Sequence, residues 1–220
     1  MNLIKARIII SGVILVLFVF LFTGVEKMSV LLSEILPPFQ LIPALLRTII
    51  QPEALFIAGL IFIILVTFIF GRVYCSFLCP LGTIQDLLIW GSKRIGLKSK
   101  QSFSKPHNGL RYTILALVVA AAVIGFLSPA SLLDPYSLTG RIFTYFLQPL
   151  IIQIYNLGIL TLKPFDIYLY PRQTAFIPLS AWVVTAVFVL LILYFCAQHG
   201  RLYCNTLCPA GALLGLISRI

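Results

Sequence analysis

The chain has 220 residues, of which 60% are hydrophobic and only 10% are charged, and its formal net charge is +10. A soluble domain carries about 25% charged residues, so this composition excludes an ordinary soluble enzyme and indicates a membrane protein. The basic residues gather beside apolar stretches, which makes membrane topology a better explanation of the positive charge than nucleic-acid binding.

Four apolar stretches approach the length of a membrane-spanning helix, which needs roughly 20 residues. They cover residues 8–25, 54–70, 110–127 and 176–196. The first is interpreted as an uncleaved anchor, because no small-residue cleavage pattern follows it. The sequence therefore predicts an all-α polytopic membrane protein with about four transmembrane helices plus interfacial helices, with the lipid bilayer as its first partner.

The distribution of Lys and Arg predicts the orientation. With four spans, one side of the membrane holds both termini and the segment between the second and third spans, with eleven basic residues and one acid, Asp86. The other basic residues are balanced by five acids on the opposite side. The basic side is expected to be cytoplasmic, which predicts a multi-pass protein of the bacterial inner membrane with cytoplasmic N- and C-termini.

The two segments expected on the opposite side are rich in proline. Residues 26–51 resemble a short interfacial helix. Residues 129–173 contain an apolar stretch at 143–162 that suits an interfacial or re-entrant helix. A fifth span there is rejected, because it would place the second of two repeated motifs outside the cell.

Those motifs are the most informative feature of the chain. Residues 71–82 read GRVYCSFLCPLG and residues 200–211 read GRLYCNTLCPAG, so that eight of twelve positions are identical. Each motif follows a predicted span and precedes another apolar run, which indicates two parallel repeats. The single membrane domain, 1–220, divides into 1–53 (first span and outer loop), 54–109 (repeat 1), 110–175 (third span and outer segment) and 176–220 (repeat 2).

The motifs contain Cys75, Cys79, Cys204 and Cys208, four of the five cysteines. Thiols on the cytoplasmic side stay reduced, so these pairs are better interpreted as metal or redox ligands than as disulfides. In each pair the second cysteine precedes a proline, which is expected to begin a helix whose N-terminus favours a thiolate. A pseudo-twofold axis along the membrane normal would bring both pairs to one site, which suits a 4Fe-4S cluster.

Two alternatives remain open from the residues alone. Four thiolates also hold structural zinc, which would make the chain a zinc-stapled structural or transport protein. They also bind copper, which would make it a metal-handling assembly factor of a respiratory oxidase. The looser C-x3-C spacing and the location at the ends of membrane helices favour an iron–sulfur cluster that passes electrons.

The paired Tyr-Cys-x3-Cys-Pro-x-Gly sequences at the ends of spans resemble those of the membrane 4Fe-4S binding, polyferredoxin-like family. The resemblance extends from about residue 54 to residue 220. It implies electron transfer with a ferredoxin or reductase subunit as partner, a possible quinone donor, and the four motif cysteines as cluster ligands. The chain is then an electron carrier or a subunit of an oxidoreductase complex rather than an enzyme on its own.

One departure from the family concerns the C-terminus. Family members usually carry a ferredoxin segment, C-x2-C-x2-C-x3-C-P, after the last membrane element, and this sequence has none. We therefore expect either a truncated chain or a core that is served by a separate ferredoxin.

Overall fold

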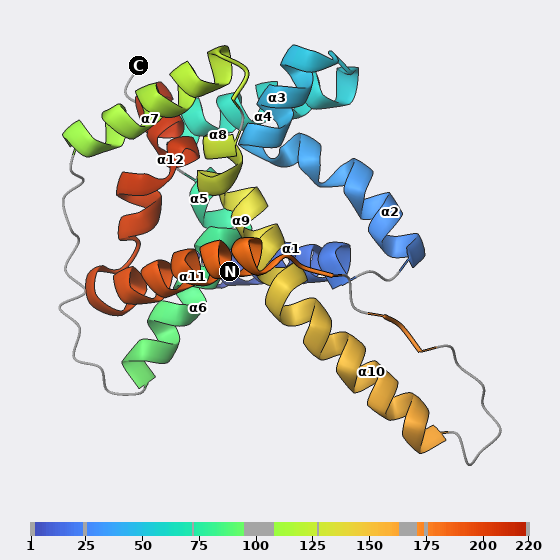
Figure 1. Ribbon diagram of the computed structural model, residues 1–220. Helices are drawn as coiled ribbons and strands as arrows, with labels where there is room; N and C mark the ends of the chain where they lie inside the picture. The colour runs from blue at the N-terminus through green and yellow to red at the C-terminus, as the bar shows by residue number, and fades with distance from the viewer. Residues whose placement is uncertain are drawn as a thin grey trace.

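The computed structural model describes residues 3–23, 26–71, 73–94, 108–126, 128–162, 171–173 and 176–218. Every regular element in these ranges is helical (Figure 1), which confirms the all-α prediction. The elements are α1 (Leu3–Thr23), α2 (Glu26–Ile35), η1 (Pro37–Phe39), α3 (Leu41–Ile50), α4 (Ala54–Phe70), α5 (Tyr74–Phe77), α6 (Pro80–Arg94), α7 (Asn108–Val123), α8 (Ser128–Leu133), α9 (Pro135–Ile142), η2 (Phe143–Leu147), α10 (Gln148–Leu162), α11 (Leu179–His199), η4 (Tyr203–Leu207) and α12 (Pro209–Ile217).

Three helices among the described residues are long and apolar enough to cross a membrane. They are Lys5–Thr23, Pro135–Ile159 and Leu179–Gln198. A fourth crossing is possible if Met28–Phe39 and Leu41–Ile50, which meet at a bend of 90°, form one broken span or re-entrant element. The first and last of the four predicted spans thus appear as long helices, whereas α4 and α7 are shorter, with 17 and 16 residues.

Residues 135–162 differ from the expectation. The predicted interfacial or re-entrant stretch is instead part of an almost straight succession of α9, η2 and α10, and its stretch Pro135–Ile159 is 25 residues long. The π-helical turn η2 joins the two α-helices without a break in the helical backbone, as single π-turns do where they occur inside α-helices. In Figure 1 this rod leaves the centre of the molecule and ends far from it.

The described helices make the same set of contacts twice. After each motif, the following helix contacts the span that precedes the other motif: α6 contacts α11, and α12 contacts α4. In addition, α1 contacts α5 and α6, while α7 contacts η4 and α12. The repetition therefore extends beyond the segments found in the sequence and includes α1 and α7.

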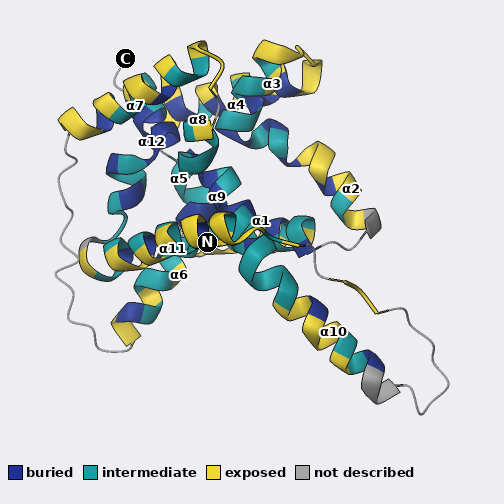
Figure 2. Cartoon of the chain, in the orientation of Figure 1, coloured by how far each residue is buried: buried dark blue, intermediate teal, exposed yellow. Residues whose placement is uncertain are grey.

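The main buried cluster lies where the two repeats meet. It contains Tyr74 and Cys79 from the first motif, Tyr203 and Cys208 from the second, and Leu138 from α9. Figure 2 shows buried residues concentrated around α5, α9 and α12, while α10 presents many exposed ones. Large apolar side chains are exposed along α1, α4 and α11, as expected where helices face lipid.

Candidate metal centre

Each motif begins with a glycine that turns the chain at the end of a helix. Gly71 caps α4 and Gly200 caps α11, and both have φ of 71°, in the left-handed region that glycine adopts readily. Because the two turns have the same backbone geometry, the chain leaves both helices in the same way. This is why equivalent cysteines occupy equivalent positions.

A second glycine in each motif allows close backbone packing against the first cysteine. A Cβ added to Gly82 would lie 2.2 Å from the carbonyl oxygen of Cys75, and one added to Gly211 would lie 2.3 Å from that of Cys204. Real Cβ atoms do not approach backbone oxygens so closely. Each C-x3-C turn is therefore folded tightly onto the helix that follows it.

Within the described residues, the four motif cysteines form no disulfide, and all four lie in or against the main buried cluster. Cys79 and Cys208 are 2% and 4% exposed, while Cys75 and Cys204 are partly buried. Burial raises the pKa of the Cys204 thiol well above its ordinary value, and Cys208, Cys79 and Cys75 raise it further. Thiols of both repeats therefore lie close enough to Cys204 to raise its pKa.

Backbone N–H groups at the helix starts point to the second cysteine of each pair. The N–H of Gly211 donates to Cys208 Sγ at 3.4 Å, and Cys208 is the extended N-cap of α12. In the first repeat, burial raises the pKa of Cys79 to about 12, Cys75 adds to the rise, and the N–H groups of Gly82 and Leu81 oppose it. The expected helix-start effect is present, but burial outweighs it in the free thiol.

Within the described ranges, no group of three or more His, Cys, Asp or Glu side chains is close enough to hold a metal ion. A cubane is wider than a single ion and accepts ligands that stand further apart. In the described residues, the motif thiols therefore stand further apart than the ligands of a single metal ion.

The tyrosine before the first cysteine of each motif anchors the site to segments predicted on the opposite side of the membrane. The Tyr74 hydroxyl donates to Gln40 Oε1 at 2.9 Å and accepts from the N–H of Leu41 at 3.1 Å. The Tyr203 hydroxyl donates to the carbonyl of Leu133 at 3.2 Å. Both tyrosines are essentially buried. The segments around Gln40 and Leu133 therefore reach the motifs, which the charge pattern did not predict.

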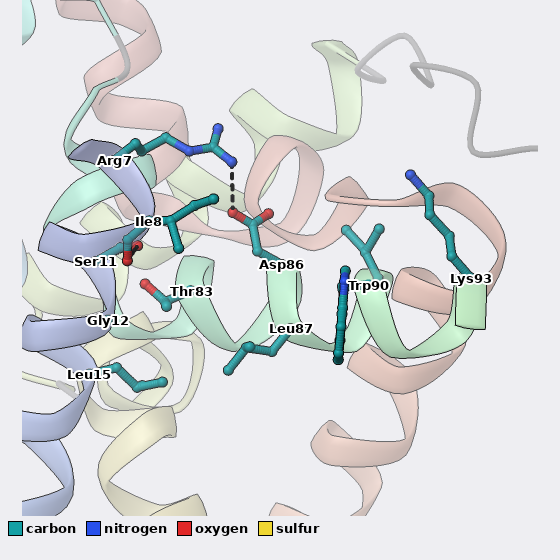
Figure 3. Close-up of a pocket in the computed structure, with 11 residues that line it drawn as sticks. Arg7, Ile8, Ser11, Gly12, Leu15, Thr83, Asp86, Leu87, Trp90 and Lys93 are labelled. Atoms are coloured by element: carbon teal, nitrogen blue, oxygen red, sulfur yellow. Dashed lines mark hydrogen bonds and ion pairs between the residues drawn. The ribbon is translucent and has the colours of Figure 1, made fainter. Parts of the chain in front are cut away.

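Helix α6 of the first repeat contacts the second motif through two neighbouring residues. The S–H of Cys204 donates to Gln85 Oε1 at 3.2 Å. Arg201 donates through Nε to Asp86 Oδ1 at 2.7 Å and through a second N–H to Asp86 Oδ2. Asp86 also faces Arg7 of α1 at 3.5 Å, in the wall of a cavity of about 570 Å³ between α1 and α6 (Figure 3).

Helix α7 contributes a buried arginine to the start of α12. Arg111 is 1% exposed and donates to the carbonyls of Gly211 and Ala212 at 2.7 and 3.0 Å. Charge counting in the sequence treated Arg111 only as a topology signal. The sequence did not predict that Arg111 lies at the second motif, because this contact joins residues that are 100 positions apart.

The residues present suit an iron–sulfur cluster. Four thiols provide the donor set that a cubane requires, and Gly82 of α6 and Gly211 of α12 let these helices pack closely against the backbone of Cys75 and Cys204. In addition, Gln85 Nε2 is buried and has no hydrogen-bond partner among the described residues. A buried amide donor beside Cys204 is the kind of group that bonds the sulfur of a metal-bound thiolate. Arg72, the first-motif equivalent of Arg201, lies outside the described residues.

The sequence analysis singled out the four cysteines but not Gln40, Gln85 and Leu133, which contact the two motifs. A repeated pattern identified the cysteines, whereas these other residues occur once and carry no motif. One weak signal was available: Gln85 and Asp86 are polar residues in the apolar run after the first motif, where the second repeat has Leu214 and Gly215.

Comparison with known proteins indicates iron–sulfur chemistry. A family described as 4Fe-4S binding domain matches residues 54–98 and 179–220, which include both motifs. The chain is 26% identical over 167 residues to the ferredoxin-type protein NapH of Haemophilus influenzae, covering 76% of this chain and 45% of that protein. It is 23% identical to the putative electron transport protein YccM of Escherichia coli, covering 72% of this chain and 38% of that protein.

A third relative is the methylamine utilization ferredoxin-type protein MauN of Paracoccus denitrificans, 26% identical over 68% of this chain and 40% of that protein. The chain thus spans less than half the length of these curated relatives. No solved structure matches it.

The apolar helices and the matched domain together define a membrane iron–sulfur protein, and its cofactor is an iron–sulfur cluster. Within that class, the matched segments and the ferredoxin-type relatives support the membrane 4Fe-4S binding, polyferredoxin-like family that the paired motifs indicated.

Proposed function

We propose that this chain transfers electrons through one 4Fe-4S cluster held between its two repeats, with the four motif cysteines as ligands. The observation that carries the proposal is the packing of both cysteine pairs in one buried core: Cys79 and Cys208 belong to it, and Cys75 and Cys204 pack against it. Cys208 supports the same conclusion, because its pKa is raised first by burial and then by Cys75 and Cys79 of the other repeat. Two independent sites would not require this proximity.

When bound, the cluster supplies one-electron redox chemistry. The chain itself holds the thiols rigidly and keeps water away from the second cysteine of each pair. The glycine turns fix the backbone, the tyrosines tie it to neighbouring segments, and the N–H groups at the starts of α6 and α12 favour negative charge at the sulfurs. Because the backbone around the thiols is fixed and water is kept away, the structure of the site is expected to change little between the two redox states of the cluster.

The membrane arrangement belongs to the proposal as well. Both termini and both motifs lie on the cytoplasmic side of a bacterial inner membrane, which is the side that the excess of Lys and Arg favours. The described contacts between the repeats agree with motifs on a common side, because α6 packs against α11 and α12 against α4.

The partners follow from the chemistry of one cluster. A relative named as a putative electron transport protein and two named as ferredoxin-type proteins support a role in an electron-transfer chain. The acceptor is a ferredoxin or a reductase subunit, and the donor is the quinone pool or a ferredoxin. A quinol gives up two electrons, so its oxidation would require a further centre beside the single cluster.

The test begins with anaerobic purification of the chain in detergent and measurement of iron, acid-labile sulfide, and the visible and electron paramagnetic resonance (EPR) spectra. We expect about four irons and four sulfides per chain, with the spectrum of a reducible cubane. Colourless protein with stoichiometric zinc, or copper in place of iron, would contradict the proposal.

Single substitutions then test whether the two repeats share the site. Cys75→Ser and Cys204→Ser should each abolish the same cluster. Cys196→Ala provides the matched control, because Cys196 is a buried thiol in α11 that lies outside the motifs. A full cluster remaining in either serine variant would exclude ligation across the repeats.

A further inference from the structure

We propose that two neighbouring residues of α6 in the first repeat set the reduction potential of the cluster by acting on the second motif: Gln85 raises the potential, and the Asp86 carboxylate partly offsets the rise caused by Arg201. Gln85 donates a hydrogen bond to the Cys204 thiolate, and Asp86 orients the Arg201 guanidinium beside the site. Both are positioning residues. This inference rests on the proposed function, since it requires a cluster at the motif cysteines.

The environment of Gln85 carries the first half of the argument. Its side chain is fully buried, its Oε1 accepts from the Cys204 S–H at 3.2 Å, and its Nε2 has no partner in the described part of the chain. A cysteine that binds iron is a thiolate and has no S–H to donate. The amide must then present Nε2 to the same sulfur, which satisfies the orphaned donor.

A hydrogen bond of this kind favours the reduced cluster. Reduction adds negative charge that spreads onto the sulfurs, and an N–H donor stabilises the more negative state more strongly. Hydrogen bonds to the sulfurs are among the factors that set the reduction potential of iron–sulfur centres. Gln85 is therefore expected to raise the potential.

The pair of Asp86 and Arg201 carries the second half. Arg201 makes a two-pronged contact with the Asp86 carboxylate, the geometry that fixes a guanidinium in direction as well as distance. Arg201 interacts electrostatically with Cys204 of its own motif and with Cys75 of the other. Asp86 thus holds one positive charge close to thiols of both repeats, while its own negative charge partly offsets it.

The arrangement is one-sided. The residues equivalent to Gln85 and Asp86 in the second repeat are Leu214 and Gly215. Leu214 is fully buried and offers no hydrogen bond, and glycine has no side chain with which to hold an arginine. The polar contacts that act on motif 2 from α6 therefore have no counterpart at these positions of α12.

Redox titration of the purified full chain, followed by EPR, tests the proposal with four variants. Gln85→Leu installs the residue of the other repeat, and Arg201→Gln removes the positive charge, so both should lower the midpoint potential. Asp86→Asn removes a negative charge with little change in shape and should raise it. The double variant Asp86→Asn/Arg201→Gln should return toward the unmodified value, because the two charges offset each other.

Glu53→Gln is the matched control. Glu53 pairs with Arg47 at 3.9 Å at an exposed position away from the motifs, so its loss should leave the potential unchanged. Iron content of each variant is measured alongside. If the unmodified chain holds no cluster, the proposed function itself fails. Suppose instead that the unmodified chain holds a cluster. If Asp86→Asn then keeps full iron and the original potential, and Gln85→Leu or Arg201→Gln does so too, only the present inference is overturned.

Discussion

The two motif tyrosines occupy equivalent positions but are hydrogen-bonded differently. Among the described residues, the Tyr74 hydroxyl makes two hydrogen bonds, one to the buried Gln40 side chain and one from a backbone N–H, whereas the Tyr203 hydroxyl makes one, to a carbonyl. A buried donor or acceptor left without a partner costs about 1–3 kcal/mol, and a single hydrogen bond contributes about 1 kcal/mol. The loss of the Tyr74 hydroxyl should therefore be the more damaging.

We expect Tyr74→Phe to lower the thermal unfolding temperature more than Tyr203→Phe does. Circular dichroism of the purified variants in the same detergent measures both. Phenylalanine keeps the buried ring in each case, so the comparison isolates the hydroxyl group. An equal or larger effect of Tyr203→Phe would show that the contact with Gln40 and Leu41 contributes little.

Asp134 introduces a pH dependence near the site. It is 2% exposed, caps α9 by accepting from the N–H of Ser137 at 3.0 Å, and burial raises its pKa from 3.8 to about 6. Since its folded-state pKa lies above the unfolded one, its stabilising contribution is fully present below about pH 4 and is lost as the pH rises through about 6.

Asp134→Asn removes this titration and keeps a good helix cap. We expect the unmodified chain to lose stability relative to the variant between about pH 4 and pH 7, by about 3 kcal/mol for a shift of this size. Thermal unfolding of both proteins at several pH values measures the difference. Parallel pH profiles would mean that Asp134 has the same pKa in the folded and unfolded chains.

At the scale of elements, the tight turn between each motif and the next helix decides whether the thiols can converge. In α6, a Cβ at Gly82 would collide with the carbonyl oxygen of Cys75, whereas a Cβ at Gly91 would meet nothing within 4 Å. The two positions share one helix but differ in their contact with the motif. They therefore form a matched pair.

We expect Gly82→Ala, and likewise Gly211→Ala, to lose most of the bound iron, because only backbone movement relieves the clash. Gly91→Ala should keep the full complement and gain slightly in helix stability, since alanine favours helices by about 1 kcal/mol over glycine. Iron and acid-labile sulfide per chain are the measurements. Full iron in Gly82→Ala would mean that the turn is looser than described.

The sequence predicted these turns and helices better than it predicted their neighbours. Cys-Pro pairs, spaced glycines and long apolar runs are local signals, so the starts of α6 and α12 and the bounds of α4 could be read from the pattern. The contacts of Gln40 with Tyr74, of Leu133 with Tyr203, and of Arg111 with Gly211 join segments between 34 and 100 residues apart. No local pattern encodes such pairings.

At the scale of the whole molecule, either α7 or the helix Pro135–Ile159 could make the third membrane crossing. At about 1.5 Å per residue, the 16 residues of α7 reach about 24 Å, which is short of the roughly 30 Å hydrocarbon core. The 25 residues of Pro135–Ile159 reach about 37 Å. Arg111, near the start of α7, donates to carbonyls at the start of α12. Leu133, just before the longer helix, accepts a hydrogen bond from Tyr203 of the second motif.

Both ends of the segment 108–134 thus lie at the level of the second motif, and we expect Pro135–Ile159 to make the third crossing in place of α7. Residue 167 is then still expected outside the cell, so the number of crossings and the expected cytoplasmic position of both motifs stay the same. The turn at Gly125, by contrast, moves to the cytoplasmic side. This expectation differs from the sequence analysis, which placed the third span at the apolar stretch 110–127.

Protease sites inserted after residues 98, 125 and 167, one per variant, distinguish the arrangements. The Gly125 turn is exposed and open, since an added Cβ there would meet nothing within 4 Å, and it should tolerate insertion. We expect cleavage after 98 and 125 only in inside-out vesicles and cleavage after 167 only in right-side-out vesicles. Cleavage after 125 from outside would restore α7 as the crossing helix. Cleavage after 167 from inside would instead place the two motifs on opposite faces, where no single cluster joins them.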